Sequence, residues 1–386
     1  MNLHDVSQAA IPLTYQRLGV VLAPDDSPYE AEGVLNPAVV RDRSGHLLLF
    51  PRMVAAGNVS RIGICRGGEN NPIDITRLGV VFEPDEEYER RTAPGGYGCE
   101  DPRVTFIPRL DLFAMAYTAF GPHGPRIAIA TSHDAYTWTR HGRIVFADDE
   151  LNHVPNKDAA FFPEPVLSPS GVPSFALYHR PMLHESINGQ APISFILALP
   201  ASKREVTCIG YIPVEQVLRG EAQALCSIAE STRVLEVGET WGRLKNGCGT
   251  PPLRTPAGWL SIFHGVDARE HRNAPSTLYY RAGLVIHDLE RPDRVVYRSS
   301  DPFLAPETPA ERYGVVDDVV FPTGLDELGG GSYHLYYGAG DARISLARLE
   351  IGGARLTTRR KRGSGSASPG SAGKCPGAPE PMGLSS

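Results

Sequence analysis

Three features are missing from this chain: an apolar stretch of 18 residues, a Cys-x-x-Cys pair and an excess of basic charge. The first absence argues against a membrane-spanning helix. The formal net charge of −6 differs from the basic surface of nucleic-acid-binding proteins. We therefore expect neither a membrane nor a nucleic acid as a partner. The six cysteines are scattered, which is typical of reduced cytosolic thiols: Cys65, Cys99, Cys208, Cys226, Cys248 and Cys375.

Several catalytic signatures are also absent. No Walker loop, no His-Glu-x-x-His and no Gly-x-Ser-x-Gly occurs, which argues against P-loop nucleotide hydrolysis, zinc proteolysis and the α/β-hydrolase mechanism. Aspartates and histidines are too dispersed to indicate a metal site, so we expect no metal and no cofactor. The first residues, Met1 to Asp5, lack the charged and apolar segments of a secretory signal. The expected location is the cytoplasm.

Glycine and proline are abundant instead. The 40 glycines and 34 prolines among 386 residues are about 10% and 9% of the chain, against roughly 7% and 5% on average. Proline interrupts helices and central strands, and glycine serves tight turns. The composition therefore indicates many short strands joined by turns.

One pattern recurs five times: a polar residue near a proline or an apolar pair, a turn, an apolar strand and a second short strand. The copies start at Asn36, Asp101, Asp158, Thr250 and Asp318, which lie 65, 57, 92 and 68 residues apart. Short strands at near-even spacing are typical of propeller blades. The sequence thus predicts an all-β fold, a five-bladed β-propeller, whose inner strands bring the polar residues of the repeat starts together at a central channel.

The predicted propeller spans residues 1–356. The long third interval indicates an insertion at about 201–246, where apolar residues from Val214 to Ile228 fall near helical spacing, although Gly220 weakens the helix. Residues 357–386 are rich in Gly, Ser and Pro after a basic run, and we expect this tail to be disordered.

The densest cluster of functional side chains is Glu100-Asp101-Pro102-Arg103, which follows the glycine-rich segment from Gly95 to Cys99. In a regular strand, neighbouring side chains point to opposite faces, so Glu100 and Asp101 are not expected to face the same spot. A carboxylic acid that donates a proton needs a raised pKa, which burial or a nearby like charge supplies. A capped turn with an exposed Asp-Arg pair is the alternative.

Three cations occur at related repeat positions: Arg180, Lys245 and His264. If all three face one channel, they indicate an anionic ligand, because arginine and lysine both bind phosphate oxygens. Carboxylates and amides that accompany aromatic residues are common in sugar sites, and Trp259 and Tyr337 belong to such clusters. Structural roles in blade packing are the alternative for each of these residues.

Taken together, the ordered motifs resemble glycoside hydrolase family 130, the mannoside phosphorylases and related mannosidases. The resemblance runs from about Asn36 to Leu349. It rests on Asn36-Pro37, Glu100 to Arg103, Asn156-Lys157-Asp158, Phe162-Pro163-Glu164, Lys245 to Pro252, Gly258-Trp259-Leu260, His264-Gly265, Val319 to Pro322 and Tyr337-Gly338-Ala339. The family's fold is a five-bladed propeller, in agreement with the repeats.

The resemblance implies inverting phosphorolysis of a β-mannoside, with inorganic phosphate as co-substrate and α-mannose 1-phosphate as product. Asp101 would be the proton donor and would act through a sugar hydroxyl, while phosphate attacks the anomeric carbon directly. The residues expected to contact the mannoside or manno-oligosaccharide are Asn36, Arg52, Glu100, Arg103, Asn156, Lys157, Asp158 and Asp341. Those expected to hold phosphate are Arg180, Lys245, His264 and Tyr280.

The sequence departs from the family's pattern at two places. Pro155 stands where phosphorylases often carry an arginine, and Asp317-Asp318 stands where an asparagine is commoner. The first change removes one phosphate contact, and the second adds a carboxylate. An inverting β-mannosidase, with Glu164 or Asp318 as its base, is therefore one alternative, and a non-catalytic glycan-binding propeller is another. Assembly into a homo-oligomer is possible because symmetric assembly is common among soluble enzymes.

Overall fold

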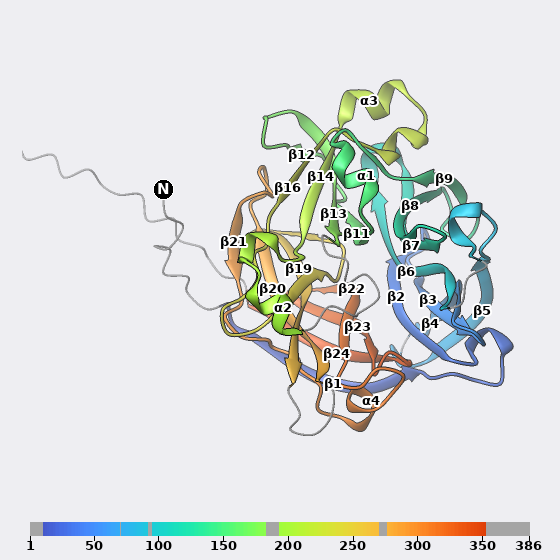
Figure 1. The fold of residues 1–386 in the computed structure, drawn as a ribbon. Helices are drawn as coiled ribbons and strands as arrows, with labels where there is room; N and C mark the ends of the chain where they lie inside the picture. Colours follow the sequence, from blue (N-terminus) through green and yellow to red (C-terminus); the bar gives the residue numbers. More distant parts are fainter. Residues whose placement is uncertain (1–10, 70, 92–94, 183–192, 270–275, 353–386) are drawn as a thin grey trace, which may run out of the picture. The chain divides into compact units, whose positions relative to one another are not determined.

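Strands dominate the part of the chain that the computed structural model describes, residues 11–69, 71–91, 95–182, 193–269 and 276–352 (Figure 1). The fold is all-β, as predicted. The predicted tail at 357–386 lies outside the described residues. None of the described helices is both long and apolar enough to cross a membrane.

The strands form five antiparallel groups of four in chain order, which we number first to fifth. The first group contains β2 (Gly33–Arg41), β3 (Leu47–Ala55), β4 (Val59–Gly67) and β5 (Ile75–Phe82). The second contains β6 (Tyr97–Ile107), β7 (Leu112–Gly121), β8 (Gly124–Ser132) and β9 (Thr139–Arg143). A short parallel pairing between β4 and β6 joins these two groups into one sheet of eight strands.

The remaining strands repeat the same antiparallel order. The third group contains β11 (Asn156–Phe161), β13 (Pro173–Pro181), β14 (Cys208–Pro213) and β16 (Glu230–Arg233), with β12 (Val166–Leu167) also paired to β13. The fourth contains β17 (Lys245–Cys248), β19 (Gly258–Arg269), β20 (Thr277–His287) and β21 (Val295–Arg298), with β18 (Leu253–Thr255) also paired to β19. The fifth contains β22 (Val320–Gly329), β23 (Ser332–Ala339), β24 (Arg343–Ile351) and β1 (Leu13–Leu22).

Helices in the described residues are short and lie between strands. The α-helices are α1 (Asp149–His153), α2 (Ile193–Ala198), α3 (Val214–Arg219) and α4 (Pro309–Arg312). The 3-10 helices are η1 (Pro28–Glu30), η2 (Glu87–Glu89), η3 (Pro108–Leu110), η5 (Ala201–Lys203) and η6 (Ala222–Cys226). A two-stranded parallel ladder is formed by β10 (Val145–Phe146) and β15 (Ser227–Ile228).

Two sequence-based expectations need correction. The interval 201–246 is not only an insertion, because β14 and β16 lie within it and complete the third group. Its predicted helix is divided at Gly220, where the backbone becomes extended, into α3 and η6. The fourth group starts at Lys245 and not at Thr250, since Pro251 and Pro252 cannot donate to a strand ladder and the chain leaves β17 before them.

Hydrophobic clusters link these groups in a cyclic order. One cluster lies between each consecutive pair of groups, and another joins the fifth group back to the first. The pairs that represent these clusters are Phe50 with Phe113, Ile129 with Leu177, Tyr178 with Trp259, Ile262 with Leu335 and Tyr336 with Leu49. Strand β3 shows how one strand contributes to two clusters: Leu48 and Phe50 belong to one, and Leu47 and Leu49 belong to the other. Both faces of such a strand are buried, so its sequence is continuously apolar.

The fifth group combines β1 with three strands from the end of the described chain. Arg17 on β1 reinforces this pairing, because its Nε donates to Oε1 of Glu311 at 2.9 Å. The Glu311 side chain is only 1% exposed, and the Tyr337 hydroxyl donates to the same oxygen at 2.7 Å. Loss of Arg17 would leave a buried carboxylate without its cation.

We therefore expect Arg17→Met to lower the free energy of unfolding by about 3 kcal/mol, since breaking a buried ion pair from one side is strongly destabilising. Urea denaturation followed by fluorescence measures this change. The matched control is Arg348→Met, which breaks an ion pair to Glu350 with side chains 50% and 47% exposed. The control should cost at most about 1 kcal/mol. Equal losses in the two variants would contradict the role of Arg17 in closing the fifth group.

Candidate active site

Irregular backbone marks the starts of the repeats. Asn36, Asp101, Asp158 and Asp318 have φ angles of 45°, 45°, 59° and 58°, in the left-handed region. Asparagine and aspartate tolerate this region better than other residues with a Cβ atom, because their short side chains bond locally. The ladders of β2, β6 and β11 shift register at these positions. Each of the three strands therefore carries a bulge, which redirects the side chains next to it.

The bulge in β6 brings Glu100 and Asp101 to the same cation, so the expectation that they face different spots was wrong. Arg52 Nη2 donates to Glu100 Oε1 at 3.0 Å, and Arg52 Nη1 donates to Asp101 Oδ1 at 3.4 Å. Strict alternation holds only for a regular strand, and the left-handed φ of Asp101 breaks it. The alternative of an exposed Asp-Arg pair is wrong as well, since Asp101 is only 6% exposed.

Asn36 completes the surroundings of Asp101. Its Nδ2 donates to Asp101 Oδ1 at 2.9 Å. This contact depends on Gly338 of β23, because a Cβ atom there would lie 2.0 Å from Asn36 Oδ1. We refer to Asn36, Arg52, Glu100, Asp101 and the nearby Asp341 as the Asp101 group.

The carboxyls of this group differ in proton affinity. Burial raises the pKa of Asp101, but the charges of Arg52 and Lys157 outweigh burial and leave that pKa below its ordinary value. Burial raises the pKa of Glu100 above its ordinary value despite the charge of Arg52. The pKa of Asp341 is raised by burial too, and the negative charge of Asp101 adds to this effect. Without a ligand, Asp101 therefore holds its proton less tightly than its two neighbours do.

A second set of side chains surrounds Arg180. Its Nε donates to Asp158 Oδ2 at 2.6 Å, and its Nη1 donates to Glu205 Oε2 at 2.6 Å. His264 Nε2 lies 3.6 Å from Asp158 Oδ2. Lys245 is close enough that the positive charge of Arg180, second to burial, lowers the pKa of its ammonium group. We call Asp158, Arg180, Glu205, Lys245 and His264 the Arg180 group.

His264 is not a cation in this site, contrary to the expectation from sequence. Its side chain is fully buried, and burial lowers the pKa of its imidazole to about 3. Neither ring nitrogen has a hydrogen-bond partner among the described residues. The ring instead packs against Phe321, with 4.5 Å between centroids, and against Tyr280, with 6.0 Å. A neutral imidazole with unpaired nitrogens can donate one hydrogen bond to a polar ligand and accept another.

Lys157 connects the two groups. Its charge lowers the pKa of Asp101 and also that of Asp158. Burial raises the pKa of Tyr280, and the charges of Lys157 and Arg180 oppose that increase. The two groups therefore share one electrostatic environment, which contains most of the residues expected from the sequence.

Two expected substrate contacts have a different environment. The Arg103 guanidinium donates to the backbone carbonyls of Asp101 and Gly249 and is 1% exposed. It therefore braces the bulge, while its Nη2 has no hydrogen-bond partner among the described residues. The Asn156 side chain contacts the ring of His179, at 3.1 Å between Nδ2 and Nδ1, and no contact joins it to the Asp101 group within the described ranges.

The two carboxylates suggested as a hydrolytic base are also engaged elsewhere. Glu164 is 48% exposed at its side chain and pairs with Arg254 at 3.4 Å. Asp318 pairs with Arg269 at 2.6 Å. Glu205 is the buried carboxylate that the sequence did not reveal. It lies in the interval interpreted as an insertion, with no motif around it, so only its contact with Arg180 identifies it.

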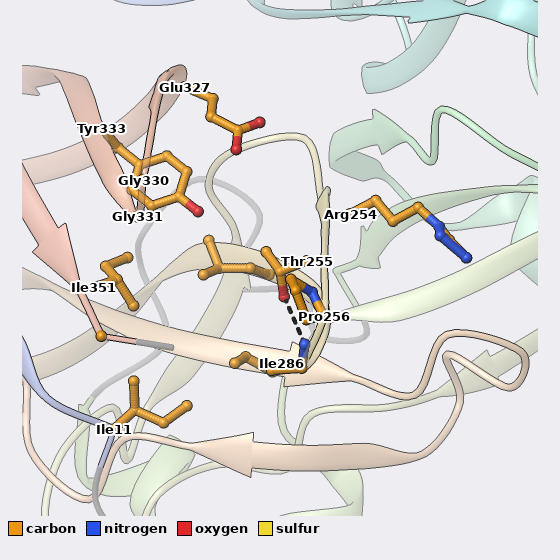
Figure 2. Close-up of a pocket in the computed structure, with 13 residues that line it drawn as sticks. Ile11, Arg254, Thr255, Pro256, Ile286, Glu327, Gly330, Gly331, Tyr333 and Ile351 are labelled. Atoms are coloured by element: carbon orange, nitrogen blue, oxygen red, sulfur yellow. Dashed lines mark hydrogen bonds between the residues drawn. The ribbon is translucent and has the colours of Figure 1, made fainter. Parts of the chain in front are cut away.

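A separate pocket lies at the other end of the strands (Figure 2). It has a volume of about 310 Å³ and is lined by Ile11, the turn from Thr255 to Ala257, the turn at Gly330 and Gly331, and Tyr333. The turn at Gly330 and Gly331 follows the last residue of β22, whereas Asp318 precedes the first residue of that strand. The pocket contains no residue of the Asp101 or Arg180 groups, so we do not assign the chemistry to it. Within the described ranges, no group of three or more potential ligand side chains could hold a metal ion.

The neutral state of His264 has a consequence for stability. In the unfolded chain a histidine takes up a proton near pH 6.5, whereas in the folded chain the pKa of His264 is about 3. The unfolded state therefore binds more protons as pH falls below 6.5, and folding stability decreases. Between pH 7.5 and 5.0 this one group should remove about 2 kcal/mol of unfolding free energy.

We expect His264→Asn to lose less stability over that pH range than the parent protein, by about the same 2 kcal/mol. Urea unfolding at the two pH values measures it. His153→Asn is the matched control, because the His153 side chain is 76% exposed, and it should follow the parent. An unchanged pH dependence in His264→Asn would show that this imidazole titrates normally.

Comparison with known proteins shows the family of this chain. A family model described as beta-1,4-mannooligosaccharide phosphorylase, glycoside hydrolase family 130, matches residues 13–353. A 1,2-beta-oligomannan phosphorylase of Thermoanaerobacter sp. (strain X514) is 27% identical over 342 residues, which are 86% of this chain and 95% of that protein.

Two solved structures share the fold. The beta-1,2-mannobiose phosphorylase from Listeria innocua, in complex with beta-1,2-mannobiose, superposes with a TM-score of 0.65 at 20% identity, over 87% of this chain and 96% of that one. A structure described under GH130 glycoside hydrolases that target beta-1,2 mannosidic linkages in Candida mannan gives 0.62 at 21% identity, over 87% and 93%. The match of the family model over nearly all of the described residues shows that the chain belongs to glycoside hydrolase family 130.

Proposed function

We propose that the protein catalyses inverting phosphorolysis of a β-mannoside and releases α-mannose 1-phosphate. The observation that carries this proposal is the buried carboxylate Asp101, held by Asn36 and Arg52, in a site where the charge of Lys157 acts on both Asp101 and Asp158 of the Arg180 group. The names of the relatives, which are mannobiose and oligomannan phosphorylases, support the same substrate class. The products would be the sugar phosphate and a shortened glycan or sugar.

The fold that supports this site is, we propose, a five-bladed propeller in which each group of four strands is one blade. The cyclic order of the hydrophobic clusters supports closure. The first strands also lie side by side, since β2 contacts both β6 and β22, and β11 contacts both β6 and β17 (Figure 1). Strand β1 would then close the ring by joining the last blade. We assign this domain to residues 1–356 and the tail to 357–386.

In the proposed reaction, a phosphate oxygen attacks the anomeric carbon from one face while the bond to the leaving oxygen breaks on the other. Asp101 supplies the proton that the leaving oxygen takes, through a hydroxyl of the bound sugar, and regains a proton from solvent. Phosphate is already an anion, so the attack needs no general base. One essential carboxylate is enough for this mechanism, whereas inverting hydrolysis needs two.

The pKa of Asp101 is lowered in the free site, so Asp101 is ionised there. Bound substrates must raise this pKa before Asp101 can donate a proton. A phosphate anion beside Lys157 and the Arg180 group adds negative charge, and a bound sugar displaces water. Both effects favour the neutral carboxylic acid and raise its pKa. The acid would therefore become competent only when both substrates are present, which protects the glycosidic bond from wasteful protonation.

Lys245 is the residue we expect to contribute most to phosphate affinity. The two carboxylates on Arg180 already balance the charge of that guanidinium. No ion pair to Lys245 occurs among the described residues, and its side chain is partly exposed. Tyr280 and the neutral His264 add hydrogen-bonding groups beside it. The mannose unit would lie against the Asp101 group.

Hydrolysis is the second candidate because of Glu205. An inverting hydrolase needs a carboxylate about 6.5–9.5 Å from the acid to activate water. Glu164 and Asp318 are tied to surface arginines, whereas Glu205 is buried in the Arg180 group. In this version water would replace phosphate and the product would be free mannose. A glycan-binding protein without turnover is the remaining alternative.

An assay of a panel of β-linked mannosides, with and without inorganic phosphate, separates these functions. Mannose 1-phosphate that forms only with phosphate supports the proposal. Free mannose at a rate independent of phosphate supports hydrolysis through Glu205. Absence of any product from the panel would favour the binding protein.

We propose a cytoplasmic location for the protein. The buried free thiols of the described cysteines are compatible with the cytoplasm, which contains inorganic phosphate.

We expect Asp101→Asn to lower kcat by about 10²- to 10⁴-fold, because general acid catalysis supplies a factor of this size. Initial rates at saturating mannoside and phosphate measure the effect. The matched control is Asp111→Asn, since Asp111 also has a left-handed φ of 52° but lies on the surface in an ion pair with Arg43. Asp111→Asn should keep the parent rate. Full activity in Asp101→Asn would remove Asp101 from the role of acid.

We also expect Lys245→Gln to raise the KM for phosphate about tenfold or more, because a hydrogen bond to a charged group contributes roughly 1.5–3 kcal/mol. The KM for the mannoside should change much less. Lys203→Gln, at an exposed position, is the control for loss of one lysine. A larger change in the KM of the mannoside than in that of phosphate would contradict the assignment of the anion site.

A further inference from the structure

A second polar pocket lies between the second and third groups of strands, outside the site described above. Its volume is about 460 Å³, which is within the usual range of about 300–1,000 Å³ for small-molecule sites. Strand β8 contributes Arg126 and β9 contributes His141 and Arg143, while the opposite wall includes Asn156 and Gln223. Every residue that lines it belongs to the described part of the chain.

The two arginines in this pocket have no acidic partner. Neither Arg126 nor Arg143 forms an ion pair within 4.0 Å among the residues that the structure describes. Arg126 donates only to the carbonyl of its neighbour Pro125, at 3.0 Å, and Arg143 lies over the ring of Tyr88, 6.0 Å from its centroid. By contrast, Arg52 and Arg180 each contact two carboxylates.

Arg126 and Arg143 line the same pocket, and their like charges disfavour each other. Burial lowers the pKa of Arg126, and the positive charge of Arg143 lowers it further. An anion between the two guanidinium groups would remove the repulsion and accept charge-assisted hydrogen bonds from both. The pocket is therefore suited to an anionic ligand.

The other residues that line the pocket indicate what kind of molecule carries the anionic group. His141 is neutral around pH 7, since burial lowers the pKa of its ring, and its Nε2 is 2.7 Å from the hydroxyl of Thr131. The amide of Gln223 can bind hydroxyl groups, and Phe146 provides a buried apolar surface. An amide, an aromatic face and two arginines together fit a small polyhydroxylated molecule with one charged group.

We propose that this pocket binds a phosphate or carboxylate group between Arg126 and Arg143, with a sugar as the molecule that carries it. The site is distinct from the one for the phosphate that attacks the mannoside, which we assign to Lys245 and the Arg180 group. Asn156 lines this pocket, and no residue of the Asp101 or Arg180 groups does. A charged sugar there would be a second ligand or a charged part of the glycan substrate.

Binding of mannose 6-phosphate, glucuronate, inorganic phosphate and uncharged mannose, measured by isothermal titration calorimetry, tests the proposal. We expect mannose 6-phosphate or glucuronate to bind the full-length protein at least about tenfold more tightly than mannose. The variant Arg126→Gln/Arg143→Gln should lose at least that factor. Lys245→Gln should bind the charged sugar like the parent. If inorganic phosphate binds the pocket as tightly as the charged sugar does, the ligand is the free ion. If inorganic phosphate binds more weakly, the ligand is a sugar that carries the charged group.

Several results would overturn the proposal. They are equal affinity for mannose and its phosphate, an unchanged affinity in the double variant, or loss of binding in Lys245→Gln alone. Arg109→Gln/Arg312→Gln removes the same charge from exposed positions and should bind like the parent. If the double variant folds poorly, Arg143→Gln alone can be tested, because Arg143 is an exposed residue. This single variant should also bind the charged sugar more weakly than the parent. The double variant should still turn over any neutral β-mannoside that the parent accepts, so failure here is separate from failure of the proposed reaction.

Discussion

The bulge at Asp101 is the constraint on which the candidate site depends. With a φ of 45° at Asp101, β6 abandons strict alternation and presents two adjacent carboxylates to one arginine. A regular strand would turn Glu100 and Asp101 to opposite faces, and Arg52 could hold only one of them. The same distortion recurs in β2 and β11, where it positions Asn36 and Asp158. Three bulged first strands therefore build the site, while the rest of each group supplies the buried faces that hold those strands in place.

The electrostatics of the site follow from burial. Arg180 is 2% exposed and contacts two carboxylates that are themselves buried. Taking these three charges out of water is costly, so their mutual contacts must offset the loss of hydration. In the proposed site that balance would leave Lys157 and Lys245 to attract a ligand anion, while burial keeps His264 neutral. A site composed only of cations would bind phosphate more tightly, but it would also hold Asp101 more firmly in its ionised form and weaken it as an acid.

The repeats in the sequence predicted the all-β fold and most of the first strands, because both depend on local patterns. Apolar runs such as Leu47 to Phe50 mark strands buried on both faces, and glycine and proline mark the turns. The errors came from effects that the local pattern does not contain. Bulges change the direction of side chains without changing the residues, so the alternation rule failed at Asp101. Two strands of the third group, β14 and β16, were taken for part of an insertion because helical turns lie between them.

The individual functional residues were harder to derive than the fold. Motifs pointed to Asp101, Asp158 and Arg180, which the structure brings into two adjoining groups. The same motifs gave Arg103 a ligand contact, whereas its guanidinium braces the backbone of the bulge. Glu205 carries no motif, and its importance appears only when Arg180 is seen between two carboxylates. In the proposed reaction, the contact between Glu205 and Arg180 would decide between phosphate and water. While Glu205 holds Arg180, phosphate would be left to Lys245, as phosphorolysis requires. A Glu205 released from Arg180 would be free to accept a proton from water.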